Sequence, residues 1–328
     1  MRVLVTGATG FVGGAVARRL IRDGHDVRAL ARQGSDADAL TADGIDVVRG
    51  DVRDSDGIRL ALNGCSHVIH LAAVKSGSRE LLHDVNVRGT SNVMHASAEA
   101  GVQRIVFGGG IGVHGFVTGR PIDEHSPVRP NTPYRLSKWH AEEVARDAHA
   151  HLGAPVVIAR ISSVVGRGAR GWLPMVQGIA TGRMRLIGTG ENSIDLVSIH
   201  DIVEGLIRCA VVPSIEGRLY ALGAGSSSTM AGFAATVAAA LGVAAPRPGV
   251  PAAPFRLAQR AAAVAFRLTG ISSSYLHSRE ALVADKRVSS ARARAELGYD
   301  PRASVDEAVR AMVAGYVASG KLPRYGAA

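Results

Sequence analysis

The sequence predicts an α/β fold in which a doubly wound parallel sheet is joined to a smaller, mainly helical C-terminal lobe. In the first half of the chain, short β-branched runs alternate with longer helical patterns, which is typical of parallel βαβ units. The strands are short and almost continuously apolar, as expected of a sheet that helices cover on both faces. After residue 165 this alternation weakens, and from residue 224 onward the pattern is mainly helical.

Individual elements follow from these runs. The expected strands are Arg2–Thr6, Asp26–Ala31, Ile45–Arg49, His67–Leu71, Gln103–Phe107 and Pro155–Ile161, with strand-like pieces again at Asp195–Ile199 and Arg218–Leu222. The expected helices are Phe11–Arg22, Glu80–Ala100 and Tyr134–His151. We therefore expect a sheet domain made of residues 1–165 and 195–223, and a substrate lobe made of residues 166–194 and 224–328.

The composition is that of an ordinary globular protein, with 47% hydrophobic and 20% charged residues in 328. The net charge of +10 comes mainly from scattered arginines without a basic run interleaved with aromatics, so we expect no nucleic-acid partner. No run of roughly 18 apolar residues and no leader pattern occurs, which predicts a cytoplasmic protein without a membrane partner. Cys65 and Cys209 stand in unrelated contexts, so neither a disulfide nor a metal site is expected.

A glycine-rich turn follows the first strand. Glycines at three points allow a tight turn, close approach of the backbone to a pyrophosphate, and close packing of helix on strand. The free N–H groups and the positive end of the following helix stabilise phosphate oxygens. This turn is predicted to bind a dinucleotide through Gly7, Thr9, Gly10, Phe11, Val12 and Gly13.

The TGxxGxxG spacing of this turn resembles that of the extended short-chain dehydrogenase/reductases, the NAD-dependent epimerase/dehydratase family, and in particular its 3β-hydroxysteroid-dehydrogenase-like branch. Further segments that are similar to family motifs are Gly50–Val52, His70–Ala73, Asn86–Thr90 and Arg292–Pro301. The resemblance implies a Rossmann sheet, a homodimer and a small-molecule substrate. It also implies cofactor contacts at Asp51, Val52, Leu71, Ala72, Ala73, Asn86, Ile161 and Ser163.

The end of the second strand bears on the choice of nicotinamide cofactor. An acidic residue there would bond the adenosine ribose and disfavour a 2′-phosphate. This chain has Ala31 at that point and Arg32 directly after it, and a guanidinium suits phosphate recognition. NADP(H) is therefore favoured over NAD(H), with a solvated, uninvolved Arg32 as the alternative.

Tyr134 and Lys138 lie four residues apart, on one face of a predicted helix. A phenol is a poor base at neutral pH, and a neighbouring ammonium lowers its pKa. The pair is thus predicted to exchange a proton with a substrate alcohol or carbonyl, and the resemblance implies that the lysine also holds the nicotinamide ribose. We therefore predict that Tyr134 and Lys138 both take part in catalysis and both contact the cofactor.

The family places a Ser or Thr after the fifth strand, where its hydroxyl bonds the substrate oxygen. Here that position falls on Gly110, which has no side-chain donor. Three replacements stay open: a substrate group or water, backbone N–H groups of the glycines at 108–110, or Ser162 or Ser163 from the next strand. His114, in the same loop, is expected to be structural.

The substrate is less defined. Ile194 stands where sugar-nucleotide members carry a pyrophosphate-binding Arg, which argues against a nucleotide sugar unless Arg183 or Arg185 of the preceding segment takes that role. Gly109, Gly110, Ser162 and Ile194 are the candidate substrate residues. The apolar, Arg-spaced segment 254–268 either caps a hydrophobic pocket, packs in the core, or lies on the surface as an amphipathic helix.

Taken together, these features favour an NAD(P)-dependent oxidoreductase acting on a ketone or secondary alcohol of a fairly apolar, non-nucleotide substrate. One alternative is an epimerase or dehydratase that oxidises a sugar-type substrate transiently with bound cofactor. The other is a cofactor-binding regulator with little turnover.

Overall fold

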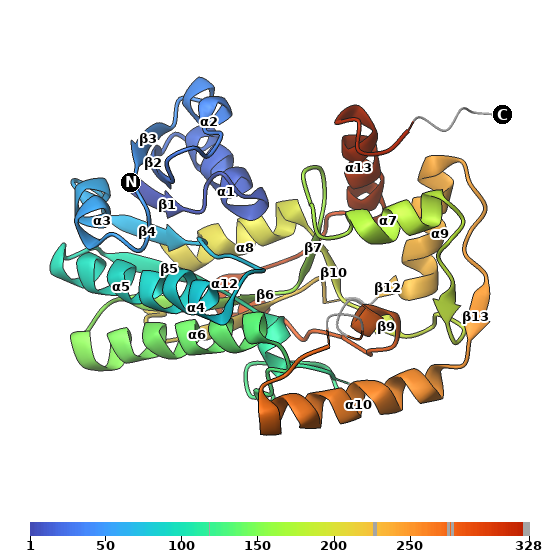
Figure 1. Cartoon of the computed structure of the whole chain (residues 1–328). Coiled ribbons are helices and arrows are strands. Elements are labelled where there is room, and N and C mark those ends of the chain that lie inside the picture. Colours follow the sequence, from blue (N-terminus) through green and yellow to red (C-terminus); the bar gives the residue numbers. More distant parts are fainter. Residues whose placement is uncertain (118, 226–227, 274–275, 277–278, 324–328) are drawn as a thin grey trace.

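A seven-stranded parallel sheet forms the centre of the molecule (Figure 1). The computed structural model describes the chain except residues 118, 226–227, 274–275, 277–278 and 324–328. The strand order is β11-β6-β5-β4-β1-β2-β3, which doubles back on either side of β1 and confirms the doubly wound Rossmann topology. The strands are β1 (Arg2–Thr6), β2 (Asp26–Ala31), β3 (Asp46–Arg49), β4 (His67–His70), β5 (Arg104–Gly110), β6 (Val156–Ile161) and β11 (Leu219–Leu222).

Helices cover both faces of this sheet, because successive side chains of each strand point to opposite sides. Val3 and Val5 of β1 join one core with α1 (Phe11–Arg22) and α8 (Ile199–Val211). Leu4 between them joins the other core, with α3 (Ser55–Leu62), α5 (Gly89–Glu99) and α6 (Pro133–Leu152). The short helix α2 (Asp38–Ala42) precedes β3.

Two elements differ from the sequence prediction. β5 runs to Gly110, three residues further than expected, because residues 108–110 pair in register with Ala159–Ile161 of β6. The predicted long helix is divided into α4 (Arg79–Leu82), a π-helical segment (His83–Arg88) and α5. The π-helical segment contains Asn86. The backbone carbonyl of Asn86 accepts a hydrogen bond from the side-chain hydroxyl of Thr90, so its acceptor is not used by backbone N–H groups alone.

The remaining elements lie beside the carboxyl ends of the strands. Val176, Phe233 and Met312 share a third core between α7 (Leu173–Ala180), α9 (Met230–Leu241) and α13 (Val305–Ala318). Short strands complete this region: β7 (Ser163–Val165) with β10 (Leu196–Ser198), β8 (Leu186–Ile187) with β13 (Pro248–Val250), and β9 (Ser193–Ile194) with β12 (Ser228–Thr229). The division into two domains stays a prediction.

Two C-terminal helices have different surroundings. Ala293 and Leu297 of α12 (Ala291–Leu297) are buried in the core that also contains α1 and α8. α10 (Ala252–Thr269) instead lies along the outer margin of the molecule, at the bottom of Figure 1. Only Gln259 and Phe266 of α10 are buried, so core packing is excluded for most of this segment. Among the described residues, no helix combines the length and apolar character needed to cross a bilayer.

Candidate dinucleotide site and active site

The turn between β1 and α1 is closed by a hydrogen bond from the Gly10 amide to the Gly7 carbonyl, 2.9 Å. Gly7 adopts φ 75°, a conformation that side chains disfavour. A Cβ at Gly7 would lie 2.7 Å from Ala72 N, and one at Gly13 would lie 2.3 Å from Gly7 O. Both glycines are therefore required by close backbone approach, as the sequence predicts.

The N-terminus of α1 opens beside this turn and has no capping side chain, because its N-cap residue is Gly10. The first-turn amides lack intrahelical partners, and the helix dipole adds positive potential there. An uncapped 12-residue helix behind a glycine turn fits a pyrophosphate.

A cleft of about 580 Å³ adjoins the turn. Its walls include predicted cofactor residues from β1, β2, β3 and β4 and the turns that follow them: Gly7, Thr9, Gly10, Arg32, Asp51, Val52, Leu71, Ala72 and Ala73. Ser35, Asp36, Arg18 and Arg170 also line the cleft and were not foreseen. The residues of different strands meet here because the carboxyl ends of parallel strands share one edge of the sheet.

Arg32 lies exposed at one end of this cleft, and its guanidinium makes no hydrogen bond to the described residues. Arg18 of α1 lines the same cleft while its Nε donates to Asp43 Oδ2 at 2.5 Å. Asp51 carries the nearby negative charge, and the hydrogen bond from Arg53, with the charge of Arg32, holds the pKa of that carboxyl below its ordinary value. Three arginines, Arg18, Arg32 and Arg170, thus line the cleft, and Arg32 directly follows β2.

Asn86 fastens the segment after β4 to α6 and has no amide proton left for a ligand. Its Oδ1 accepts from Val74 N at 2.8 Å, and its Nδ2 donates to Val74 O and to Ser137 Oγ, each at 2.9 Å. The buried side chain therefore positions residues 72–74 along the cleft. A direct cofactor contact by Asn86 stays a prediction.

The buried side chain of His70 also fixes the segment after β4 that lines the cleft. Its two ring nitrogens bond Thr6 Oγ1 at 2.6 Å and Thr90 Oγ1 at 2.9 Å, which links β1, β4 and α5. Complete burial lowers the pKa of His70 to about 3, so the imidazole is neutral. The Thr6 hydroxyl also accepts from the Ala72 amide, 3.2 Å, and so holds the turn at the cleft wall.

Tyr134 and Lys138 lie one turn apart near the start of α6, which begins at a capping Thr132. Lys138 is buried, and its Nζ donates to the Gly108 carbonyl at 2.8 Å and lies 4.6 Å from the ring centre of Phe107. Burial lowers the pKa of Lys138 to about 8, although Glu142 opposes this. Burial likewise raises the pKa of Tyr134, so the phenol is protonated at neutral pH. The sequence-based expectation that Lys138 lowers the Tyr134 pKa is not met, because desolvation dominates and the opposing charge comes from Arg135.

The three glycines of β5 have unequal surroundings. A Cβ at Gly108 would lie 2.3 Å from Leu71 Cδ2, so any side chain there requires the end of Leu71 to move. At Gly109 the nearest atom is Ala159 O at 3.4 Å. At Gly110 it is Ile161 O at 3.8 Å, and the backbone is extended, with φ −158°. Space and backbone conformation at Gly110 are therefore compatible with a serine.

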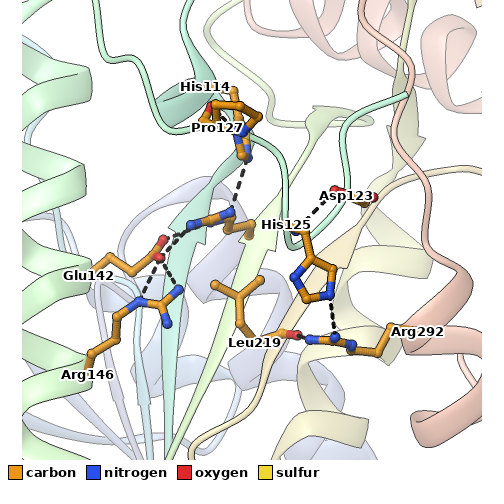
Figure 2. A network of polar contacts seen from close by, with 9 residues as sticks. His114, Asp123, His125, Pro127, Glu142, Arg146, Leu219 and Arg292 are labelled. Atoms are coloured by element: carbon orange, nitrogen blue, oxygen red, sulfur yellow. Dashed lines mark hydrogen bonds and ion pairs between the residues drawn. The ribbon is translucent and has the colours of Figure 1, made fainter. Parts of the chain in front are cut away.

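A buried ionic network lies beside Gly109, where a Cβ would be 3.5 Å from Glu142 Oε2 and 3.6 Å from Arg160 Cγ. Figure 2 shows this network. Glu142 of α6 accepts from Arg160 of β6 at 2.7 and 3.0 Å and from Arg146 at 2.8 Å. Arg160 Nη1 also donates to His114 Nε2 at 3.2 Å, so the Nδ1 proton of His114 goes to the Pro127 carbonyl, 3.0 Å. Burial lowers the pKa of His114, and both of its nitrogens are engaged. His114 is thus structural, as expected from the sequence.

A second group of contacts in Figure 2 involves Arg292, in the segment Arg292–Pro301 that is similar to a family motif. Arg292 of α12 donates to the Leu219 carbonyl and contacts His125 Nε2 at 3.0 Å. These contacts join α12 to the edge strand β11 and to the loop before α6. Their geometry indicates a structural role for this segment.

The candidate substrate residues are not all brought together. Ser162 is buried and its Oγ donates to the Asp195 carbonyl at 3.1 Å, which occupies its only proton. Ile194 is buried in the third core with Val165 and Leu196. Ile161 and Ser163 are half-buried at the carboxyl end of β6 and the start of β7. Of the candidate substrate residues, only Gly109 and Gly110 belong to β5, the strand whose Gly108 carbonyl accepts the hydrogen bond from Lys138. Gly110 pairs with Ile161 of β6.

These features define a Rossmann protein with a glycine turn that suits a dinucleotide and a Tyr–Lys pair on α6 whose lysine bonds β5. The chain belongs to the NAD-dependent epimerase/dehydratase family, whose model matches residues 3–223, and the predicted resemblance is confirmed. Among the residues that the structure describes, no group of His, Cys, Asp and Glu is arranged to hold a metal ion.

Three known proteins illustrate the relationship. The chain is 30% identical to a 2-alkyl-3-oxoalkanoate reductase of Stenotrophomonas maltophilia, over 96% of this chain and 99% of the relative. It is 29% identical to a 3-beta-hydroxysteroid dehydrogenase of Mycolicibacterium neoaurum, over 94% of this chain and 89% of the relative. The crystal structure of a UDP-glucuronic acid 4-epimerase of Bacillus cereus with NAD shares the fold, with a TM-score of 0.78 at 18% identity over 96% and 98% of the two chains.

Proposed function

We propose that this protein is an NADP(H)-preferring oxidoreductase that interconverts a ketone and a secondary alcohol on a fairly apolar, non-nucleotide substrate. The observation that carries the proposal is the protonated Tyr134 one turn from a buried Lys138, next to the glycine strand of β5. The printed names of the two relatives above, a keto-acid reductase and a steroid dehydrogenase, support redox chemistry on such substrates.

In the reducing direction, Tyr134 donates its phenolic proton to the ketone oxygen and is reprotonated from solvent. The bound nicotinamide supplies the hydride to the carbonyl carbon. A raised phenol pKa suits the acid role, because the group is protonated before the reaction at neutral pH. In the oxidising direction the same group must first lose its proton, so oxidation is expected to accelerate with rising pH.

Lys138 has two tasks in this proposal. Its ammonium stabilises negative charge that develops on Tyr134, and the family resemblance assigns it the nicotinamide ribose. Its Nζ donates to the Gly108 carbonyl, so β5 holds the ammonium against the strand that also carries Gly110.

The missing hydroxyl at Gly110 leaves room beside the reacting carbonyl. Ser162 is a weak replacement, because its proton is already donated to Asp195. A substrate group or an ordered water is favoured, since a bridging water is nearly as good a partner as a direct one. We infer that the native substrate is bulkier near its carbonyl than a substrate of a serine-bearing relative.

Cofactor preference is proposed to depend on Arg32, whose free guanidinium lines the cleft at the end of β2. Arg32→Ala is expected to weaken NADPH binding at least tenfold and to leave NADH binding within about twofold, because a charge-assisted bond to the 2′-phosphate is lost. Fluorescence titration with both cofactors measures this. Equal effects on NADPH and NADH would overturn the NADP(H) preference.

The reaction is tested by following NADPH consumption with a panel of 3-oxoalkanoates and ketosteroids. We expect stoichiometric oxidation of NADPH, with kcat lowered by about 10²-fold or more in Tyr134→Phe, which removes the proton donor. Turnover of a sugar nucleotide without net NADPH consumption favours the epimerase alternative. Cofactor binding without turnover of any substrate, unchanged in Tyr134→Phe, favours the regulator. The homodimer stays a prediction of the family resemblance, which sedimentation velocity tests.

A further inference from the structure

Exposed large apolar side chains gather on one segment of the molecule. Within the described residues nine such side chains are exposed, and five belong to residues 250–271. Their exposed fractions are Val250 42%, Leu257 70%, Val264 52%, Leu268 80% and Ile271 72%. The other four are dispersed over α3, α4, α6 and α8: Leu60, Leu81, Leu152 and Val211. Such clustering is uncommon for a surface without a partner.

Three of these five side chains form a stripe along α10, while Val250 and Ile271 lie just outside the two ends of the helix. Leu257, Val264 and Leu268 are separated by seven and four residues, which puts them on one face of a helix. The opposite face holds α10 against the protein: Phe266 is buried, and Gln259 Nε2 donates to the Leu276 carbonyl at 2.5 Å. Leu257 and Leu268 therefore point away from the protein, whereas Val264, with Arg260 and Arg267, also borders a cavity that α10 shares with residues 114–129. The helix itself lies along the margin of the molecule in Figure 1.

The charge on this helix has one sign. Arg256, Arg260 and Arg267 are its only charged residues, and all three fall on the same flank of the stripe at helical spacing. None of them forms an ion pair with a residue that the structure describes. An apolar stripe bordered by arginines is the pattern of helices that lie in a membrane interface.

We propose that α10 docks this protein onto a bilayer surface that carries anionic headgroups. The stripe enters the interface and the flanking arginines contact lipid phosphates. The charge of α10 distinguishes two possible partners. Pairing α10 with α10 of a second copy brings three positive charges against three others, whereas an anionic membrane surface is complementary in charge. The proposal departs from the sequence-based expectation of no membrane partner, and it requires no membrane-spanning helix.

The test uses the full chain and sucrose-loaded vesicles in a sedimentation assay, without substrate or cofactor. Vesicles of phosphatidylcholine and phosphatidylglycerol at 70:30 are compared with pure phosphatidylcholine. We expect binding to the mixed vesicles at least tenfold tighter than to the neutral ones, since each interfacial arginine contributes about fivefold. Raising the salt to about 0.5 M should remove most of this difference.

A variant of α10 and a matched control distinguish vesicle binding through α10 from nonspecific adsorption of the protein. Leu257→Ser/Leu268→Ser is expected to weaken binding at least tenfold, because two apolar side chains no longer leave water. The matched control, Leu60→Ser/Leu152→Ser, replaces exposed leucines on α3 and α6 and should bind like the wild type. All four side chains are exposed, so both variants should fold, which circular dichroism and cofactor binding verify.

A second pair tests the charge. Arg256→Gln should weaken binding to the mixed vesicles about fivefold, whereas Arg310→Gln on α13 should leave it unchanged. The proposal is overturned if the wild type does not sediment with the mixed vesicles, or if the stripe variant binds like its control. It is also overturned if lipid-free sedimentation velocity shows a dimer that Leu257→Ser/Leu268→Ser disrupts. Because no reaction is measured, these outcomes are independent of the proposed ketone chemistry.

Discussion

Replacing Lys138 with Met is expected to stabilise the cofactor-free protein at neutral pH. The Lys138 ammonium is buried, and burial lowers its pKa from 10.5 to about 8. A pKa lowered this far corresponds to about 3 kcal/mol of folding free energy, which is lost below pH 8 because the folded protein must hold the charge out of water. Methionine fills a similar volume without that charge.

The substitution also removes a favourable contact. The Gly108 carbonyl loses its donor, which costs about 1–3 kcal/mol for a buried acceptor. The net expectation at pH 7 is thus a gain of about 1–2 kcal/mol in the free energy of unfolding, with loss of catalysis. Such an exchange of stability against function is common at active sites.

The pH dependence gives the sharper measurement. Between pH 8 and 10.5 the unfolded chain holds a proton on Lys138 that the folded protein has released, so wild-type stability rises with pH relative to the variant. From pH 7 to pH 10 the free energy of unfolding of the wild type, measured in urea, should rise by roughly 2–3 kcal/mol relative to that of Lys138→Met. If the difference between the two proteins is constant over this range, the ammonium is not desolvated and the reasoning is wrong.

Three further predictions concern the strand and the network behind it. Gly108→Ala should lower stability by about 1–3 kcal/mol because the new Cβ overlaps Leu71, while Gly110→Ala should be nearly neutral in the same thermal melts. Gly110→Ser should fold normally, raise kcat/KM for small ketones and lower it for the native substrate, whose own group or bound water is proposed to occupy that space; unchanged native activity together with no gain on small ketones would contradict this proposal. Glu142→Gln should cost about 3–5 kcal/mol in urea unfolding because it leaves the Arg160 charge buried without its partner, and a loss below about 1 kcal/mol would contradict the burial of that pair.

The glycine turn and the Tyr–Lys pair could be predicted from the sequence because each is a local arrangement. β1, α1 and β2 have the predicted bounds, and the requirement for glycine at Gly7 and Gly13 follows from the same few residues. Tyr134 and Lys138 share a helix face wherever that helix forms. The meeting of several strand ends at one cleft was also predictable, because it follows from parallel topology.

The extension of β5 was not predictable, since glycine has little tendency to form strands. Its pairing with β6 decides the matter, and β6 lies about 50 residues further along the chain. The contact between Glu142 and Arg160 is of the same kind, because the two residues belong to different elements. No local pattern shows that a charged side chain in a strand will find its partner on a helix.

What the sequence determined by itself is therefore the fold class, the dinucleotide turn and the spacing of the proton-transferring pair, all of which depend on neighbours in the chain. Tertiary structure decided the protonation of that pair, because desolvation at Lys138 and Tyr134 depends on what surrounds them. It also decided that α10 lies at the surface. An amphipathic helix has two faces in any setting, and only packing determines which of them meets the protein and which is left to a partner.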